Sequence, residues 1–170
     1  MKIKELLLRN RSYRRFAQEP KLSHYDLVDL IDSVRLSPSA RNDQPLKFIL
    51  LHSKNTCDTI FPFTAWAGYL KDWPGPGEGE RPTSYIIILS DTEISKKTDQ
   101  DVGIAAQSIL LTAAEKGFGG CMLGSIKREK IRESFLINEK YEIPLVIALG
   151  KPTEKVVIDD IDSGDTHYYR

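Results

Sequence analysis

Cysteine and histidine are scarce in this sequence, which has two cysteines and three histidines among 170 residues. Cys57 and Cys121 show no metal-ligand spacing and give no disulfide framework. The histidines have no metal spacing either, so we expect no metal site. A Gly-x-Ser-x-Gly motif is also absent, which argues against a common class of hydrolases. We therefore expect no catalytic side chain of these classes.

Excess charge of one sign and long hydrophobic runs are missing as well. Lys plus Arg and Asp plus Glu both number 24, which gives no global field for nucleic acid or an acidic membrane. No apolar run approaches the length of a membrane span, and residues 1–11 lack the pattern of a signal peptide. We therefore expect a cytoplasmic protein with neither a nucleic-acid partner nor a membrane partner.

The stretch from Asp101 to Gly124 organises the rest of the chain. Its first sixteen residues predict a helix, with Thr98 and Asp101 at the spacing of a capping box and Gly117 at its end. Its apolar residues occupy most of the helix circumference, so we expect it to be buried on nearly every side, as a central or interface helix.

The remaining patterns predict a single domain of alternating helices and strands. Leu27, Leu30, Ile31 and Val34 form one face of an amphipathic helix that begins at a capping box of Ser23. This order of elements indicates a layered α/β protein with a mixed sheet flanked by helices, over residues 1–150, followed by a C-terminal tail, residues 151–170. Helices are expected at 3–9, with Leu6 and Leu7 facing inward, and at 23–36, 55–69, 101–116 and 127–135, and strands at 47–52, 84–89, 121–124 and 144–149.

Residues 11–15, here called the basic segment, hold three arginines and a serine. Guanidinium groups match phosphate oxygens in geometry, and a serine hydroxyl adds a donor. The same cluster is also typical of a solvated surface turn that pairs with nearby carboxylates.

Residues 37–45, here called the polar loop, lie between two prolines. Asn42 and Gln44 offer both donors and acceptors, which suits the amide and imide edge of a heterocycle. An ordinary connection between a helix and a strand is the alternative interpretation.

Two further stretches are weaker candidates. The glycines after residue 116 follow a helix and precede a strand, which is the reverse of a dinucleotide fingerprint, although a flat ligand could lie against that strand. Trp66 and Trp73 could line a site or belong to the core. Lys71 between them is a candidate cation for a negatively charged ligand.

Residues 11–16, residues 37–45 and the helix end Gly-Phe-Gly-Gly-Cys-Met-Leu-Gly, in this order, resemble the nitroreductase family of FMN-dependent oxidoreductases. The resemblance extends from about residue 4 to residue 150 and more loosely into the tail. It implies a three-layer α+β sandwich with a mixed, mainly antiparallel sheet, and an intertwined homodimer with the central helix at its interface. It also implies that the tail packs on the partner chain.

The resemblance further implies one FMN at each end of that interface. The basic segment would hold the phosphate, the polar loop would reach the FMN of the partner chain, and the strand end at 123–124 would lie against the ring. Lys151, Lys155 or Arg170 would replace the basic C-terminal residues that other members use. The residues implied for FMN binding are Arg11, Ser12, Arg14, Pro38, Ser39, Ala40, Asn42, Gln44, Lys71, Leu123 and Gly124.

The implied activity is a ping-pong exchange carried by the cofactor, with no catalytic residue of the chain. NAD(P)H gives a hydride to flavin N5, and a small oxidised acceptor such as a nitroaromatic or a quinone then takes the reducing equivalents. Two alternatives stay open: the same fold and flavin with another reaction, such as flavin fragmentation or reductive dehalogenation, and an FMN-binding module without turnover.

Overall fold

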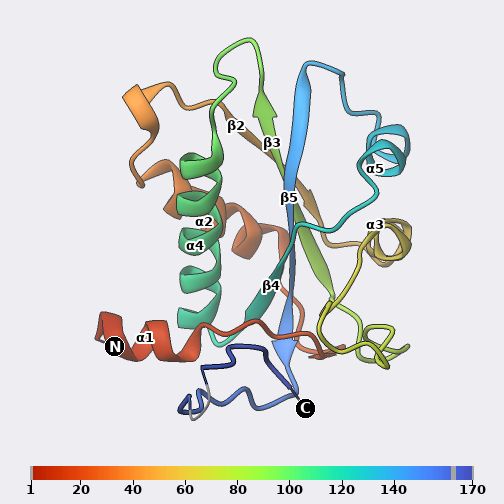
Figure 1. Cartoon of the computed structure of the whole chain (residues 1–170). Helices are drawn as coiled ribbons and strands as arrows, with labels where there is room; N and C mark the ends of the chain where they lie inside the picture. The colour runs from red at the N-terminus through yellow and green to blue at the C-terminus, as the bar shows by residue number, and fades with distance from the viewer. Residues whose placement is uncertain (1, 162–163, 170) are drawn as a thin grey trace.

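An antiparallel five-stranded sheet lies between two helical layers (Figure 1). The computed structural model describes residues 2–161 and 164–169. Its fold class, α+β in three layers with a mainly antiparallel sheet, confirms the expectation from the sequence. The elements in chain order are α1 (Ile3–Arg9), β1 (Phe16–Ala17), α2 (His24–Arg35), η1 (Ala40–Asn42), β2 (Leu46–Leu51), α3 (Lys54–Ile60), η2 (Phe61–Phe63), β3 (Ser84–Asp91), α4 (Asp99–Glu115), β4 (Gly119–Leu123), α5 (Arg128–Ser134) and β5 (Tyr141–Pro152).

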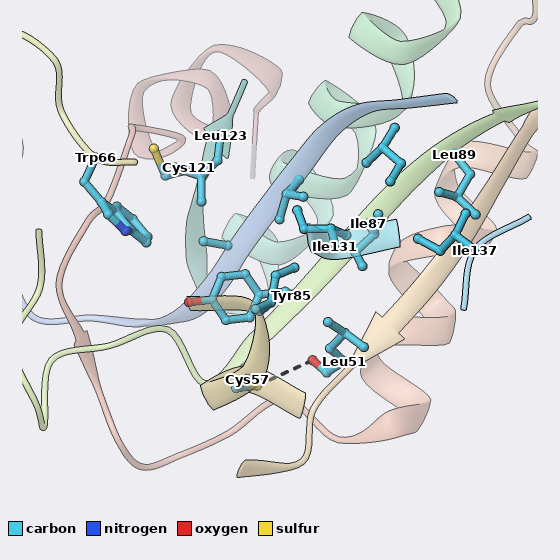
Figure 2. Close-up of a cluster of buried hydrophobic side chains, with 14 residues drawn as sticks. Leu51, Cys57, Trp66, Tyr85, Ile87, Leu89, Cys121, Leu123, Ile131 and Ile137 are labelled. Carbon is cyan, nitrogen blue, oxygen red and sulfur yellow. Dashed lines mark hydrogen bonds between the residues drawn. The ribbon is translucent and has the colours of Figure 1, made fainter. Parts of the chain in front are cut away.

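Strands β3 and β5 form the middle of the sheet and separate two hydrophobic clusters. Every residue of β3 is buried, as its continuous apolar run predicted. Because successive side chains point to opposite faces, Ile86 and Ile88 pack towards α2 and α4, while Tyr85 and Ile87 pack in the other cluster. Figure 2 shows this second cluster, in which Trp66 is a core residue with 8% of its surface exposed.

Helix α4 packs along one face of the sheet beside α2 (Figure 1). The expected burial on nearly every side is wrong for the single chain. A strip of α4 is uncovered: Gly103 and Ile104 are exposed, and Gln107 and Leu111 are half-buried. These residues share one side of the helix because they recur at about one turn. The residues of α4 that are buried are Asp101, Val102, Ala105, Ala106, Ile109, Leu110, Ala113 and Ala114.

Local signals correctly predicted the start of α2 and the end of α4, but not the capping of the start of α4. Ser23 and Asp26 form the expected capping box of α2, and Gly117 ends α4 with a φ of 79°. At the start of α4, however, the expected capping box of Thr98 and Asp101 is absent. Thr98 Oγ1 instead accepts a hydrogen bond from the Ser90 hydroxyl, because tertiary partners compete with local capping.

Two expectations about helices need correction. The helix expected at 55–69 stops at Ile60, and a single 3-10 turn follows to Phe63. Beyond it the chain pairs with the segment before α5, where the Ala65 amide donates to the Ser125 carbonyl, so it cannot continue as a helix. In α1 Leu6 is half-buried, but Leu7 is 40% exposed and does not face inward in the single chain.

Strand β5 continues to Pro152, two residues beyond the expected end of the domain, and pairs there with β1. After β5 the tail contacts residues of the same chain. Tyr168 lies against Tyr69, with ring centroids 5.0 Å apart. In the part of the chain that the structure describes, no helix combines the length and apolar character that a membrane crossing needs.

The glycine turn after α4 brings β4 tightly against its neighbours. A Cβ atom at Gly120 would lie 2.3 Å from the Ala148 carbonyl oxygen and 2.8 Å from a methyl group of Leu110. Side-chain atoms do not approach backbone so closely, so glycine at this position is a requirement of the packing. This contact sets the distance of β4 from α4 and β5.

Replacing Gly120 by alanine should lower the free energy of unfolding by about 1–3 kcal/mol, because the added methyl group overpacks the site. Urea denaturation measures the change. Gly68→Ala is the matched control, since nothing lies within 4 Å of its added Cβ. A Gly120→Ala protein as stable as this control would contradict the packing described here.

Candidate active site

Two groups of implied site residues, the basic segment and the polar loop, lie at opposite ends of α4 (Figure 1). The basic segment lies beside the start of β4, just beyond the C-terminus of α4, where the Tyr13 amide donates to the Gly120 carbonyl at 3.0 Å. The polar loop contacts the N-terminus of α4, where the Ala40 amide donates to Asp101 Oδ1 at 2.8 Å. At about 1.5 Å per residue, the helix from Asp101 to Glu115 is about 21 Å long. One chain therefore does not bring the two groups together.

The basic segment presents Arg14 and Ser12 next to β4. Ser12 is exposed and forms a parallel bridge with Gly120. The Nε atom of Arg14 is buried and has no hydrogen-bond acceptor among the described residues. Its guanidinium carbon lies 4.6 Å from the centre of the Tyr168 ring, a cation–π distance. An unpaired guanidinium nitrogen, on a segment that also carries an exposed serine, fits a phosphate group, which supplies mainly acceptors at neutral pH.

Arg11 is oriented differently from Arg14. Its Nη2 atom donates to the Leu7 carbonyl at 2.8 Å and its Nε atom to the Asn10 carbonyl at 2.7 Å. Both bonds turn the side chain back onto the end of α1. Arg11 therefore contributes positive charge near the segment, while part of its hydrogen-bonding capacity is already used.

Cys121 lies against the basic segment from the core side. Burial raises the pKa of its thiol, and the nearby Arg14 guanidinium and Ser12 hydroxyl offset only part of this rise. The sulfur is therefore a protonated thiol at neutral pH, in a side chain that is 5% exposed. Its surroundings suit packing and not nucleophilic attack.

The polar loop is held in an uncommon backbone conformation. Arg41, Asn42 and Gln44 have φ angles of 55°, 59° and 49°. Such left-handed residues other than glycine cost about 1–3 kcal/mol each and persist only where surrounding contacts hold them. Here the Gln44 amide donates to Ser39 Oγ at 3.0 Å, and its side-chain amide donates to Asn42 Oδ1 at 2.9 Å.

A cavity of about 240 Å³ lies beneath the polar loop. Pro38, Ser39, Asn42 and Gln44 line it from the loop, and Ile104 lines it from the uncovered strip of α4. The loop and the uncovered strip thus form one continuous surface. The polar groups of the loop face a partly apolar hollow, which suits a ligand with a flat apolar ring and a polar edge.

The remaining residues implied for FMN binding are Leu123 and Gly124, at the end of β4, and Lys71. Leu123 is 3% exposed and packs in the core beside Trp66 and Cys121 (Figure 2), so its side chain is not available to a ligand. Gly124 is exposed, with nothing within 4 Å of an added Cβ. Lys71 is exposed in the loop that follows Tyr69.

The tail supplies further residues near the basic segment. Lys151 Nζ donates to the Gly117 carbonyl at 2.8 Å, Lys155 is exposed, and Arg170 lies outside the described residues. Sequence reasoning missed Glu154, which accepts hydrogen bonds from the Arg14 and Arg15 amides, and Asp101 as a partner of Ala40. No local motif marks these two residues, because their partners lie 61 or more positions away in sequence.

The comparisons with known proteins identify the class to which this arrangement belongs. A model of the nitroreductase family matches residues 7–72 and 79–151. The chain therefore belongs to the nitroreductase family. A relative from Methanothermobacter thermautotrophicus, provisionally named NADH dehydrogenase/NAD(P)H nitroreductase, is 28% identical over 173 residues, covering 97% of this chain and 85% of the relative. A relative of the same provisional name from Archaeoglobus fulgidus is 25% identical, covering 89% of this chain and 86% of the relative.

Solved structures of known proteins share the fold of this chain. An FMN-dependent nitroreductase from Clostridium difficile superposes with a TM-score of 0.75 at 21% identity, covering 99% of each chain. A provisionally named nitroreductase from Exiguobacterium sibiricum, in complex with FMN, gives a TM-score of 0.76 at 15% identity, covering 100% of this chain and 98% of the other. At these identities the likeness shows the fold.

Replacing Asp101 by alanine should loosen the polar loop, because the Ala40 amide loses its acceptor. We expect a loss of about 1–3 kcal/mol in the free energy of unfolding and faster tryptic cleavage after Arg41, measured by urea denaturation and timed digestion. Asp101→Asn keeps an oxygen acceptor and should lose less than about 1 kcal/mol, from the charge at the helix start. Equal effects of both variants would show that the hydrogen bond does not hold the loop.

Proposed function

We propose that the protein is an FMN-dependent oxidoreductase that uses NAD(P)H to reduce a small oxidised acceptor, such as a nitroaromatic or a quinone, by ping-pong exchange. The Arg14 guanidinium beside β4, whose buried Nε atom has no hydrogen-bond partner among the described residues, is the observation that carries the proposal, because an unpaired guanidinium N–H favours an anionic ligand. Family membership and the names of the relatives supply the class of reaction. FMN in the Exiguobacterium structure supports the choice of cofactor.

The chain's residues would hold FMN by its two ends. Arg11, Ser12 and Arg14 would bind the phosphate through guanidinium and hydroxyl donors. The backbone at Leu123 and Gly124 would lie against the ring, since no side chain obstructs the space over Gly124. Lys71 would place a cation near the pyrimidine edge of the ring, where positive charge favours reduction.

When bound, FMN would supply the redox chemistry that carries reducing equivalents from NAD(P)H to the acceptor. The protein's own residues would orient the ring and hold the phosphate. This division of labour is consistent with a site whose cysteine is a protonated packing residue. No acid, base or nucleophile of the chain is needed in the proposed exchange.

A homodimer would bring the two groups of residues together. The polar loop lies at the opposite end of α4 from the basic segment, so within one chain it is remote from the proposed phosphate site. The uncovered strip of α4, with Ile104 36% exposed and Leu111 half-buried, is suited to packing against the same strip of a second copy. In that arrangement Pro38, Ser39, Ala40, Asn42 and Gln44 of one chain would reach the FMN held by the other.

Binding of FMN to purified protein, followed by quenching of flavin fluorescence, tests the cofactor assignment. Arg14→Ala should weaken FMN binding by about 10- to 100-fold, the equivalent of one or two charge-assisted hydrogen bonds. Lys54→Ala removes the same charge from an exposed ion pair with Asp58 and should leave the affinity unchanged. Protein that binds no FMN, or that is not reduced by NADH or NADPH in the absence of oxygen, would contradict the proposal.

Mixing two defective variants tests whether each site draws on both chains. Arg14→Ala and Asn42→Ala proteins should each bind FMN poorly. After unfolding and refolding together in equal amounts, half of the dimers are mixed, and in these one of the two sites holds neither substitution, which restores about a quarter of all sites. Refolding each variant alone is the control. A titration that recovers no tight sites after mixing would place all binding residues of a site in one chain.

A further inference from the structure

The first residues of the tail bind the backbone of the basic segment. Beyond the pairing of β1 with β5, the Thr153 amide donates to the Arg15 carbonyl at 3.1 Å. The carboxylate of Glu154 then accepts hydrogen bonds from the amides of Arg14 and Arg15, the latter at 3.2 Å. One carboxylate oxygen, Glu154 Oε1, accepts both hydrogen bonds. The tail thus extends the contact between β1 and β5 to the backbone of Arg14, one of the residues proposed to bind the phosphate.

This contact has two physical consequences for Arg14. Hydrogen bonds from backbone amides to an ionised carboxylate are stronger than those to a neutral acceptor, so they fix the backbone of Arg14 firmly. Because the backbone of Arg14 is fixed, its side chain loses less conformational freedom when the guanidinium binds an anion. The backbone amides of Arg14 and Arg15 already donate to Glu154. A phosphate at this site would therefore be bound by the side chains of the basic segment and not by these amides.

The negative charge of Glu154 does not abolish the attraction for an anion. Three guanidinium groups, those of Arg11, Arg14 and Arg15, lie on the segment, and Glu80 is a further carboxylate close by, 3.5 Å from Arg15 Nε. Three positive and two negative charges leave the neighbourhood positive.

We propose that Glu154 is a positioning residue for the cofactor phosphate: it holds the backbone of Arg14 and Arg15 so that the Arg14 side chain is preorganised for the phosphate. The inference rests on the proposed function, because it assumes that the ligand of the basic segment is FMN. It assigns to the tail a role within its own chain.

The test compares two flavins that differ only in the phosphate. FMN and riboflavin are titrated against the unchanged protein, Glu154→Ala and Glu154→Gln, with flavin fluorescence as the readout. Glu154→Ala should weaken FMN binding about tenfold, the equivalent of one hydrogen bond, and change riboflavin binding less than about twofold. Glu154→Gln keeps an oxygen acceptor and should stay within about threefold of the unchanged protein for FMN. Glu133→Ala, an exposed carboxylate paired with Lys130, is the control and should change neither affinity.

A second measurement needs no flavin. Amide hydrogen exchange of the peptide that contains Arg14 and Arg15 should be faster by about tenfold or more in Glu154→Ala than in Glu154→Gln, because both amides lose their acceptor. Exchange elsewhere in the sheet should match the unchanged protein.

Several outcomes would overturn the inference. Tighter FMN binding by Glu154→Ala would show that the carboxylate competes with the phosphate. An equal loss for FMN and riboflavin would show a general structural role, and unchanged exchange at Arg14 and Arg15 would show that the contact does not hold the segment. Failure of the unchanged protein to bind FMN would instead remove the proposed function, and the phosphate role of Glu154 with it, whatever the exchange data show.

Discussion

The contact between the alanine-rich side of α4 and the middle of the sheet is the constraint on which the rest of the structure depends. Ala105, Ala106 and Ala113 are fully buried against the isoleucines of β3 and β5. Small side chains let the helix axis approach the sheet closely, and the buried apolar surface stabilises both layers. The length of α4 then separates the basic segment from the polar loop, and its other side is left uncovered in the single chain.

Each group of site residues is tied to the scaffold by a carboxylate that accepts backbone amides. Asp101 does this for the polar loop at one end of α4, and Glu154 does it for the basic segment at the other. Both segments carry side chains suited to a ligand, and both lack a regular element of more than one turn to hold them. A charged acceptor supplied from a rigid helix or from the end of a strand replaces that missing support.

Sequence patterns predicted the regular elements well where local chemistry decides the outcome. The capping box of Ser23, the helix-ending Gly117 and the apolar run of β3 depend on neighbours in sequence, so they can be read without knowledge of the fold. The predictions were wrong where partners distant in sequence compete with local signals. Thr98 bonds to Ser90 in place of capping its helix, and the chain after Ile60 pairs with the segment before α5.

The sequence by itself determined the order of elements and the family resemblance, because periodicity, turn residues and motif spacing are properties of the chain. It also marked Arg14 and the polar loop as residues suited to a ligand. The tertiary structure alone decided that these two groups lie at opposite ends of α4, that the Leu123 side chain belongs to the core, and that Glu154 holds the basic segment. Such facts depend on contacts between residues far apart in sequence, which packing and strand register select and which no local pattern encodes.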